Sequence, residues 1–178
     1  GILAKSMGLP VEHYVASTNI NDTIPRYIKE GIYEPLKTKS TISNAMDVSE
    51  PSNFIRIQKI FKNDLQNIKK NISGYSFDDK STMDCIRKLY QDNNYIADPH
   101  TAIGYLGLKK YLQENNIRNC NGIFVSTAHP IKFKDTVENS IDSQIEYPDS
   151  IKSIMNKEKS TLTMKSYSEL KEYLLQKD

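Results

Sequence analysis

The sequence has no long apolar run, no strong excess of charge of one sign, no tryptophan and only two cysteines. No apolar run approaches the ~20 residues that span a bilayer, and no signal peptide is recognisable, so we expect no membrane partner. The 24 basic and 22 acidic side chains leave a net charge of +2, which gives no reason to expect nucleic acid. Cys85 and Cys120 match no metal-ligand spacing, so we expect free thiols in a reducing cytoplasm and no metal site.

What the sequence does contain is enough apolar material for a folded core. Hydrophobic residues make up 38% of the 178 residues and charged residues 26%, which suits one domain or a large piece of one. The opening stretch Gly1–Gly8 has no initiator methionine and is typical of the end of a helix. We therefore expect the chain to begin within a domain.

Apolar spacing predicts strands that alternate with longer helices. Strands are expected over 11–16 and 122–126, with a shorter extended piece over 41–43. Helices are expected to begin after Asn21 or Asp22 and at His129-Pro130, and also over 54–70, 81–90, 100–113 and parts of 150–178. Gly74 is interpreted as the break after the 54–70 helix.

This alternation indicates an α/β fold, part of a three-layer α/β/α domain with a mainly parallel sheet and a helix-rich C-terminal end. The strands are few for the length, which favours part of a larger domain. We expect residues 1–141 to belong to that domain, and residues 142–178 to form a helical extension packed on it.

Two strand ends are candidate ligand sites, because open α/β sheets bind ligands beyond the carboxyl ends of their strands. One is Asn19 and its neighbours after the first strand, and the other is Thr127 with His129 after the later one. Each also has a plain structural interpretation. Thr127 suits a helix N-cap, and His129 before a proline suits a helix boundary.

The remaining polar candidates lie at helix starts and in loops. Asp98 precedes Pro99 and suits an N-cap, with His100 following it. Ser52, Asn53 and Arg56 lie beside the irregular stretch before a helix, where they could simply satisfy backbone groups. No phosphate-binding loop, dinucleotide fingerprint, zinc-protease motif or nucleophile elbow occurs. Residue patterns alone therefore predict only a folded α/β piece with two candidate sites at strand ends.

The order of five short segments goes further, because it resembles the threonine synthases of bacteria and fungi. The segments are, in order, Leu3–Pro10, Thr18–Arg26, Ser43–Arg56, Asp98–Tyr105 and Ser126–Phe133. The match is colinear from Gly1 to about Val137, and residues after about Ile141 carry little of it.

The resemblance implies a fold-type-II enzyme that depends on pyridoxal phosphate (PLP) and is similar in fold to tryptophan synthase β subunits. The implied reaction converts O-phosphohomoserine and water to threonine and phosphate, by γ-elimination and β-addition, in cytoplasmic threonine biosynthesis. The family's Schiff-base lysine belongs to an earlier segment that nothing here resembles. We therefore expect no catalytic residue in this chain, and an isolated chain that is inactive and does not hold PLP.

The resemblance also implies roles for particular residues. Thr127 corresponds to the residue that hydrogen-bonds the PLP ring nitrogen, and Asp98 and His100 are expected on the cofactor side of the site. A weaker set is expected on the substrate side, namely Asn19, Asp22, Ser52, Asn53 and Arg56.

Two other interpretations stay open. The parent could be a relative that eliminates from a different substrate, or the piece could be a non-catalytic module. We also expect apolar surface where a larger domain would continue, and self-association through that face.

Overall fold

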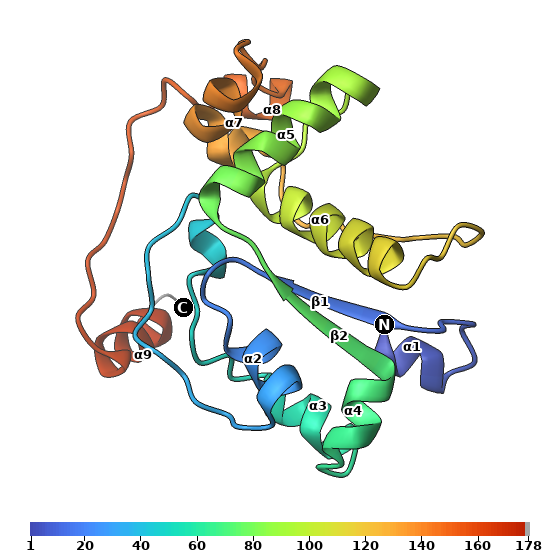
Figure 1. Cartoon of the computed structure of the whole chain (residues 1–178). Coiled ribbons are helices and arrows are strands. Elements are labelled where there is room, and N and C mark those ends of the chain that lie inside the picture. The colour runs from blue at the N-terminus through green and yellow to red at the C-terminus, as the bar shows by residue number, and fades with distance from the viewer. Residues whose placement is uncertain (177–178) are drawn as a thin grey trace. The chain divides into compact units, whose positions relative to one another are not determined.

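The computed structural model describes residues 1–176, which divide into two compact units, one over Gly1–Ile145 and one from Glu146 onward. The first unit contains α1 (Ile2–Ser6), β1 (Tyr14–Thr18), α2 (Thr23–Glu30), η1 (Asn44–Met46), α3 (Phe54–Ile60), α4 (Leu65–Asn71), β2 (Ile72–Ser76), α5 (Asp79–Asn93), α6 (Pro99–Glu114), η2 (Pro130–Phe133) and α7 (Lys134–Ile141) (Figure 1). The second contains α8 (Asp149–Lys152) and α9 (Tyr167–Leu175). The packing of the C-terminal extension on the first unit stays a prediction. Within residues 1–176, no helix is long and apolar enough to cross a bilayer.

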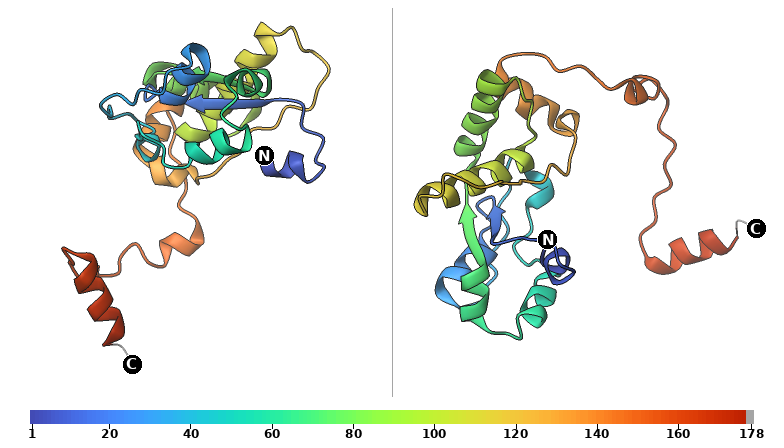
Figure 2. Two further views of the ribbon diagram at one scale, coloured as in Figure 1. Left: turned by 90° about the horizontal axis from the view of Figure 1, so that it is seen from below. Right: turned by 90° about the vertical axis from the view of Figure 1, so that its right-hand side faces the viewer.

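The first unit is built around two parallel strands between helical layers, which confirms the predicted α/β class. β1 pairs with β2 in register, Tyr14 opposite Ile72 and Thr18 opposite Ser76, and the strands lie side by side in all views (Figures 1 and 2). Alternate side chains face opposite layers. Val15 and Ser17 face α6, whereas the opposite face packs against α2 and α4.

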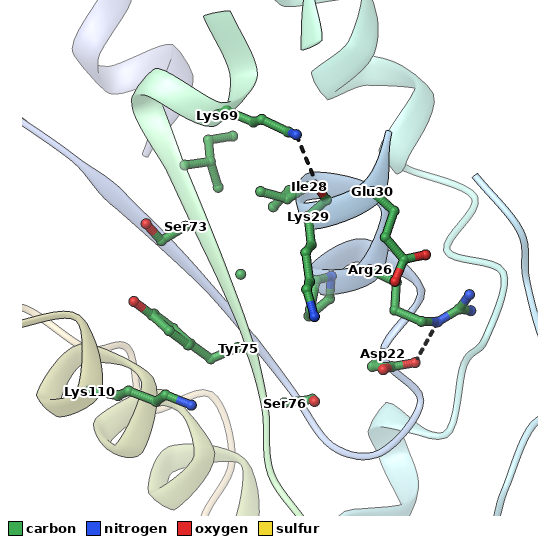
Figure 3. A pocket seen from close by; sticks show the side chains of 13 residues that line it. Asp22, Arg26, Ile28, Lys29, Glu30, Lys69, Ser73, Tyr75, Ser76 and Lys110 are labelled. Atoms are coloured by element: carbon green, nitrogen blue, oxygen red, sulfur yellow. Dashed lines mark hydrogen bonds and ion pairs between the residues drawn. The ribbon is translucent and has the colours of Figure 1, made fainter. Parts of the chain in front are cut away.

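The sequence interpretation missed β2, because Gly74 was taken only as a helix break. A β-carbon at Gly74 would lie 2.7 Å from the Pro25 α-carbon. Glycine is therefore needed where the backbone of α2 crosses the strand closely. The outer edge of β2 borders an open cleft of about 710 Å³ between α2 and α6 (Figure 3).

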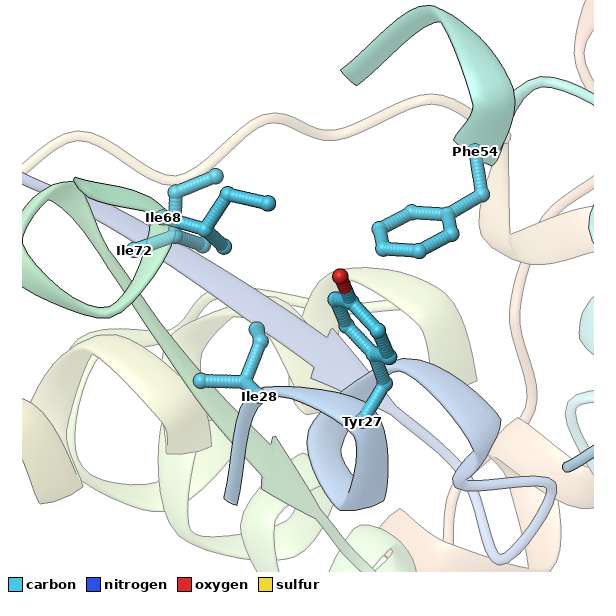
Figure 4. Packing of buried hydrophobic residues seen from close by; sticks show 5 residues of the cluster. All are labelled: Tyr27, Ile28, Phe54, Ile68 and Ile72. Carbon is cyan, nitrogen blue, oxygen red and sulfur yellow. The ribbon is translucent and has the colours of Figure 1, made fainter. Parts of the chain in front are cut away.

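One buried apolar cluster of this unit lies on the α2 side of the sheet, and Ile86, Ile103 and Val137 of α5, α6 and α7 are buried as well. Tyr27 and Ile28 of α2 meet Phe54, Ile68 and Ile72 in one buried cluster (Figure 4). The Tyr27 and Phe54 rings pack edge to face with centroids 5.0 Å apart, a favourable geometry for aromatic pairs. This cluster ties three helices to the strands.

The continuous helix predicted over 54–70 is wrong, because the chain breaks there into α3 and α4. Lys62 and Asn63 have left-handed backbone conformations, with φ of 54° and 57°. The Asp64 side chain then accepts a hydrogen bond from the Asn67 amide and starts the second helix. A helix stop followed by a new N-cap overrides the continuous apolar stripe.

Other predicted extended segments also differ from the structure. The strand expected over 11–16 lies at Tyr14–Thr18, and residues 41–43 form a turn instead of a strand. The buried strand predicted over 122–126 is wrong. This segment is irregular, and Ile123 and Val125 are 83% and 71% exposed. A strand needs a hydrogen-bonded neighbour, and the sheet within residues 1–176 contains only β1 and β2.

The predicted helices at 81–90, at 100–113 and after His129-Pro130 are confirmed as α5, α6, and η2 with α7. Large apolar side chains are exposed, and they include Leu3, Met7, Leu9, Ile123 and Val125. That they form one face where a larger domain would continue stays a prediction.

Gly107 of α6 generates a stability prediction. A β-carbon there would overlap the Ser17 hydroxyl oxygen and would lie 3.0 Å from the Ser17 β-carbon and 3.2 Å from a Val15 methyl, whereas at Gly104 the nearest atom is 3.8 Å away. Both positions gain the same helix propensity from alanine. We expect Gly107→Ala to be less stable than Gly104→Ala by about 1–3 kcal/mol, because only the first overpacks the sheet. Urea unfolding followed by circular dichroism measures this, and equal stabilities would contradict the packing.

Candidate functional site

The candidate site is centred on the buried carboxylate at the start of α6. Asp98 is the N-cap of α6, and its Oδ1 accepts hydrogen bonds from the amides of His100 at 2.9 Å and Thr101 at 3.3 Å. Its Oδ2 accepts the Thr101 hydroxyl, and its side chain is fully buried. The Asp98-Pro99 sequence thus forms a strong local helix start, as predicted.

Hydrogen bonding decides the charge of this carboxyl. Burial by itself would raise the pKa of Asp98, but the hydrogen bonds from His100 and Thr101 outweigh it and hold the pKa below its usual value. Asp98 is therefore ionised at neutral pH and acts only as an acceptor.

His100 joins this helix start to two other segments. Its Nδ1 lies 3.2 Å from Asp98 Oδ1, and its Nε2 lies 3.2 Å from the Ser43 carbonyl oxygen. Its ring also packs edge to face on Phe133, with centroids 4.8 Å apart. The side chain is only 9% exposed, so His100 supports the site as a buried residue.

Thr101 extends the contacts to the irregular segment that precedes η2. Its hydroxyl oxygen lies 3.0 Å from the Ser126 hydroxyl oxygen, and Ser126 directly precedes Thr127. We call Ser43, Asp98, His100, Thr101 and Ser126 the Asp98 network.

Thr127 lies at the open side of this network. It is exposed, and its hydroxyl makes no hydrogen bond with any other residue in the range 1–176. His129, rather than Thr127, caps the following turn, because its Nδ1 accepts from the Ile131 amide at 3.2 Å. The N-cap interpretation of Thr127 is therefore wrong, and its hydroxyl is available to a ligand.

A second buried network holds the end of β1. Asn19 is 1% exposed. Its Nδ2 lies 2.9 Å from Thr41 Oγ1, 3.0 Å from Ser43 Oγ and 2.9 Å from Asp47 Oδ1. Its Oδ1 accepts from the backbone and side chain of Asn21. Since Ser43 also contacts His100, the two networks are continuous from the end of β1 to Ser126.

The other predicted substrate residues lie apart from these networks. Asp22 accepts from Arg26 Nε at 2.9 Å, and both line the cleft beside β2 (Figure 3). Ser52, Asn53 and Arg56 are exposed around the start of α3, and within residues 1–176 their side chains have no hydrogen bond or ion pair.

Sequence reasoning placed Ser126 beside Thr127 in the second candidate site and gave no role to Ser43 or Thr101. Thr101 had a usable signal, because it follows the N-cap Asp98 by three residues on the first turn of α6. The contacts of Ser43 and Ser126 could not be predicted, since their partners lie far away in sequence. Within residues 1–176, no group of three or more acidic, histidine or cysteine side chains could hold a metal ion.

Comparison with known proteins agrees with this geometry. The family model for the C-terminal part of threonine synthase matches residues 101–174. A threonine synthase of Buchnera aphidicola, from the aphid Acyrthosiphon pisum, is 39% identical over 99% of this chain and 40% of its own length. The crystal structure of the Escherichia coli enzyme superposes with a TM-score of 0.78 at 36% identity, covering 88% of this chain and 35% of that one.

The chain belongs to the threonine synthase family. A PLP-bound threonine synthase structure from Brucella melitensis has a TM-score of 0.83 at 25% identity and covers 98% of this chain and 42% of that one. The chain thus spans about two fifths of the Buchnera and Brucella threonine synthases that it matches.

Asn19 should be needed for the stability of this chain. Asn19→Ala leaves several buried polar groups without their partner, and we expect a loss of about 1–3 kcal/mol in unfolding free energy. The matched control is Asn53→Ala at the exposed start of α3, which should change stability by no more than about 0.5 kcal/mol. Urea titration measures both, and equal effects would contradict a structural role for the Asn19 network.

The lowered pKa of Asp98 predicts acid sensitivity. A carboxyl whose folded-state pKa lies below its unfolded value of about 4 stabilises the fold fully above that pH, and the stabilisation is lost as pH falls through the folded pKa. Asp98→Asn should therefore be less stable at neutral pH and lose less stability on acidification.

Unfolding free energies measured between neutral and acid pH test this. The control is Asp92→Asn, at a 51% exposed side chain that pairs with Lys88, and it should keep the acid dependence of the unsubstituted chain. An Asp98→Asn profile parallel to that of the unsubstituted chain would refute the linkage.

Proposed function

We propose that the full-length protein containing this chain is a PLP-dependent threonine synthase, which converts O-phosphohomoserine and water to threonine and phosphate. The observation that carries the proposal is the 39% identity to a threonine synthase over 99% of this chain. The same region carries the exposed Thr127 hydroxyl, which directly follows Ser126 of the Asp98 network.

The residues present fit one end of the cofactor. A pyridine nitrogen needs a single hydrogen-bonding partner, and the Thr127 hydroxyl is exposed and free to donate. We propose that Thr127 holds the PLP ring nitrogen. No segment of the 178 residues resembles the family's lysine-bearing or phosphate-binding loops. The proposal therefore assigns those functions to the rest of the full-length protein.

When bound, PLP would supply an electron sink for the substrate carbons, and this chain's residues would orient it. Thr127 would donate a hydrogen bond from its neutral hydroxyl to the ring nitrogen. Asp98 and His100 stay our proposed residues on the cofactor side. Their bonds to Thr101, Ser43 and Phe133 make them supports for this region.

On the substrate side, Ser52, Asn53 and Arg56 stay our proposed contact residues because their exposed polar groups have no partner within residues 1–176. A guanidinium suits a phosphate ester. Asn19 and Asp22 stay in the proposed set, but their side chains are already engaged. They would therefore act by shaping the loops around the substrate.

We place the protein in the cytoplasm, with O-phosphohomoserine as its small-molecule partner. The exposed Ile123 and Val125 support the proposal that this face binds protein, either the remainder of the full-length chain or a second copy. A relative that eliminates from another amino acid is the alternative function.

The decisive experiment uses the full-length protein with PLP and O-phosphohomoserine. We expect stoichiometric formation of threonine and phosphate. We expect Thr127→Val to weaken PLP binding about fivefold, because one neutral hydrogen bond contributes roughly 1 kcal/mol. The matched control is Thr163→Val in the second unit, which is exposed and should leave PLP affinity unchanged.

Equilibrium dialysis measures the PLP affinity, and amino-acid analysis measures the product. Turnover of a different amino acid with no threonine formed would favour the alternative function. Equal PLP affinities for both variants would remove Thr127 from the cofactor site.

A further inference from the structure

The irregular segment that carries Thr127 touches α6 at two points. The Phe124 ring packs edge to face on Tyr105 at 5.5 Å, and the Ser126 hydroxyl meets Thr101. Ile123, Val125, Ser126 and Thr127 are otherwise exposed. The two contacts with α6 therefore fix the position of the backbone that leads to Thr127.

The polar anchor is a chain of side-chain contacts that starts at Asp98. Asp98 is ionised and can only accept, so the Thr101 hydroxyl donates to it. The Thr101 hydroxyl oxygen also lies 3.0 Å from the Ser126 hydroxyl oxygen, and this contact holds Ser126 beside the first turn of α6.

Thr127 directly follows Ser126 and is exposed. Its hydroxyl makes no hydrogen bond with any other residue in the range 1–176, so its hydrogen is free to be donated to a ligand. The contacts that start at a fully buried charge therefore end one residue before an exposed hydroxyl.

We propose that Asp98 and Thr101 are positioning residues, which hold Ser126 so that Thr127 presents its hydroxyl hydrogen to the cofactor ring nitrogen. This rests on the proposed function and deepens it. Asp98 does not touch the cofactor itself, because its side chain is fully buried and its oxygens are occupied by His100 and Thr101. It acts through Thr101 and Ser126.

The test uses the full-length protein and substitutes Thr101, because Asp98 also caps α6. Thr101→Val removes only the hydroxyl and leaves the backbone cap intact. Thr101→Ser keeps the hydroxyl and serves as the conservative variant. The matched control is Thr82→Val, since Thr82 is also a buried helical threonine, 1% exposed, whose hydroxyl bonds the Asp78 carbonyl oxygen at 2.8 Å.

We expect Thr101→Val to raise the PLP dissociation constant about two- to fivefold, no more than the complete loss of the Thr127 hydrogen bond would. We also expect it to change the absorption spectrum of bound PLP. Thr101→Ser should restore both properties. Thr82→Val should lose similar stability in urea while its PLP affinity and spectrum stay unchanged, which separates positioning from general destabilisation.

A double-mutant cycle tests whether Thr101 and Ser126 act through the same series of contacts. Thr101→Val and Ser126→Ala interrupt the same path, so the double variant should bind PLP no more weakly than the weaker single variant. Full additivity, or a Thr101→Val variant with unchanged PLP affinity and spectrum, would overturn the inference while leaving the proposed function standing. A full-length protein that does not bind PLP at all would overturn both.

Discussion

The site depends on one buried interaction, the ionised Asp98 carboxylate at the start of α6. Burying a charge is unfavourable unless it is fully hydrogen-bonded, and here the backbone and side chains of His100 and Thr101 supply those bonds. The same residues reach Ser43 and Ser126. The N-cap of α6 therefore also holds Ser43, in the loop after α2, and Ser126, in the irregular segment before η2.

The scaffold around this point is a parallel strand pair between helical layers. Gly74 lets α2 cross closely over one face, and Gly107 lets α6 cross closely over the other. The apolar cluster of Tyr27, Phe54 and Ile68 lies on the α2 side. The α6 side also buries apolar residues, such as Ile86 and Ile103, and it carries the polar contacts that lead to Thr127.

The two polar networks give the site rigidity without exposing their own charges. Within residues 1–176, every buried side-chain nitrogen and oxygen has a hydrogen-bond partner. Networks that are fully satisfied specify one arrangement, because any change of rotamer leaves a buried group unpaired. Thr127 differs from these residues because its exposed hydroxyl has no hydrogen-bond partner within residues 1–176, which is the property expected of a group that meets a ligand.

The sequence by itself determined the α/β class, most helices, the Asp98 cap and the family resemblance, because these depend on local spacing and on short colinear segments. It could not reveal β2, since Gly74 signals a break unless the close approach of Pro25 is known. It also misjudged 122–126, because an apolar run predicts a strand only if a neighbouring strand pairs with it. Only the tertiary structure decided that Asn19 is a buried support, that Asp98 reaches Ser126 through Thr101, and that Thr127 faces outward. Those facts depend on contacts between residues far apart in sequence, which no local pattern encodes.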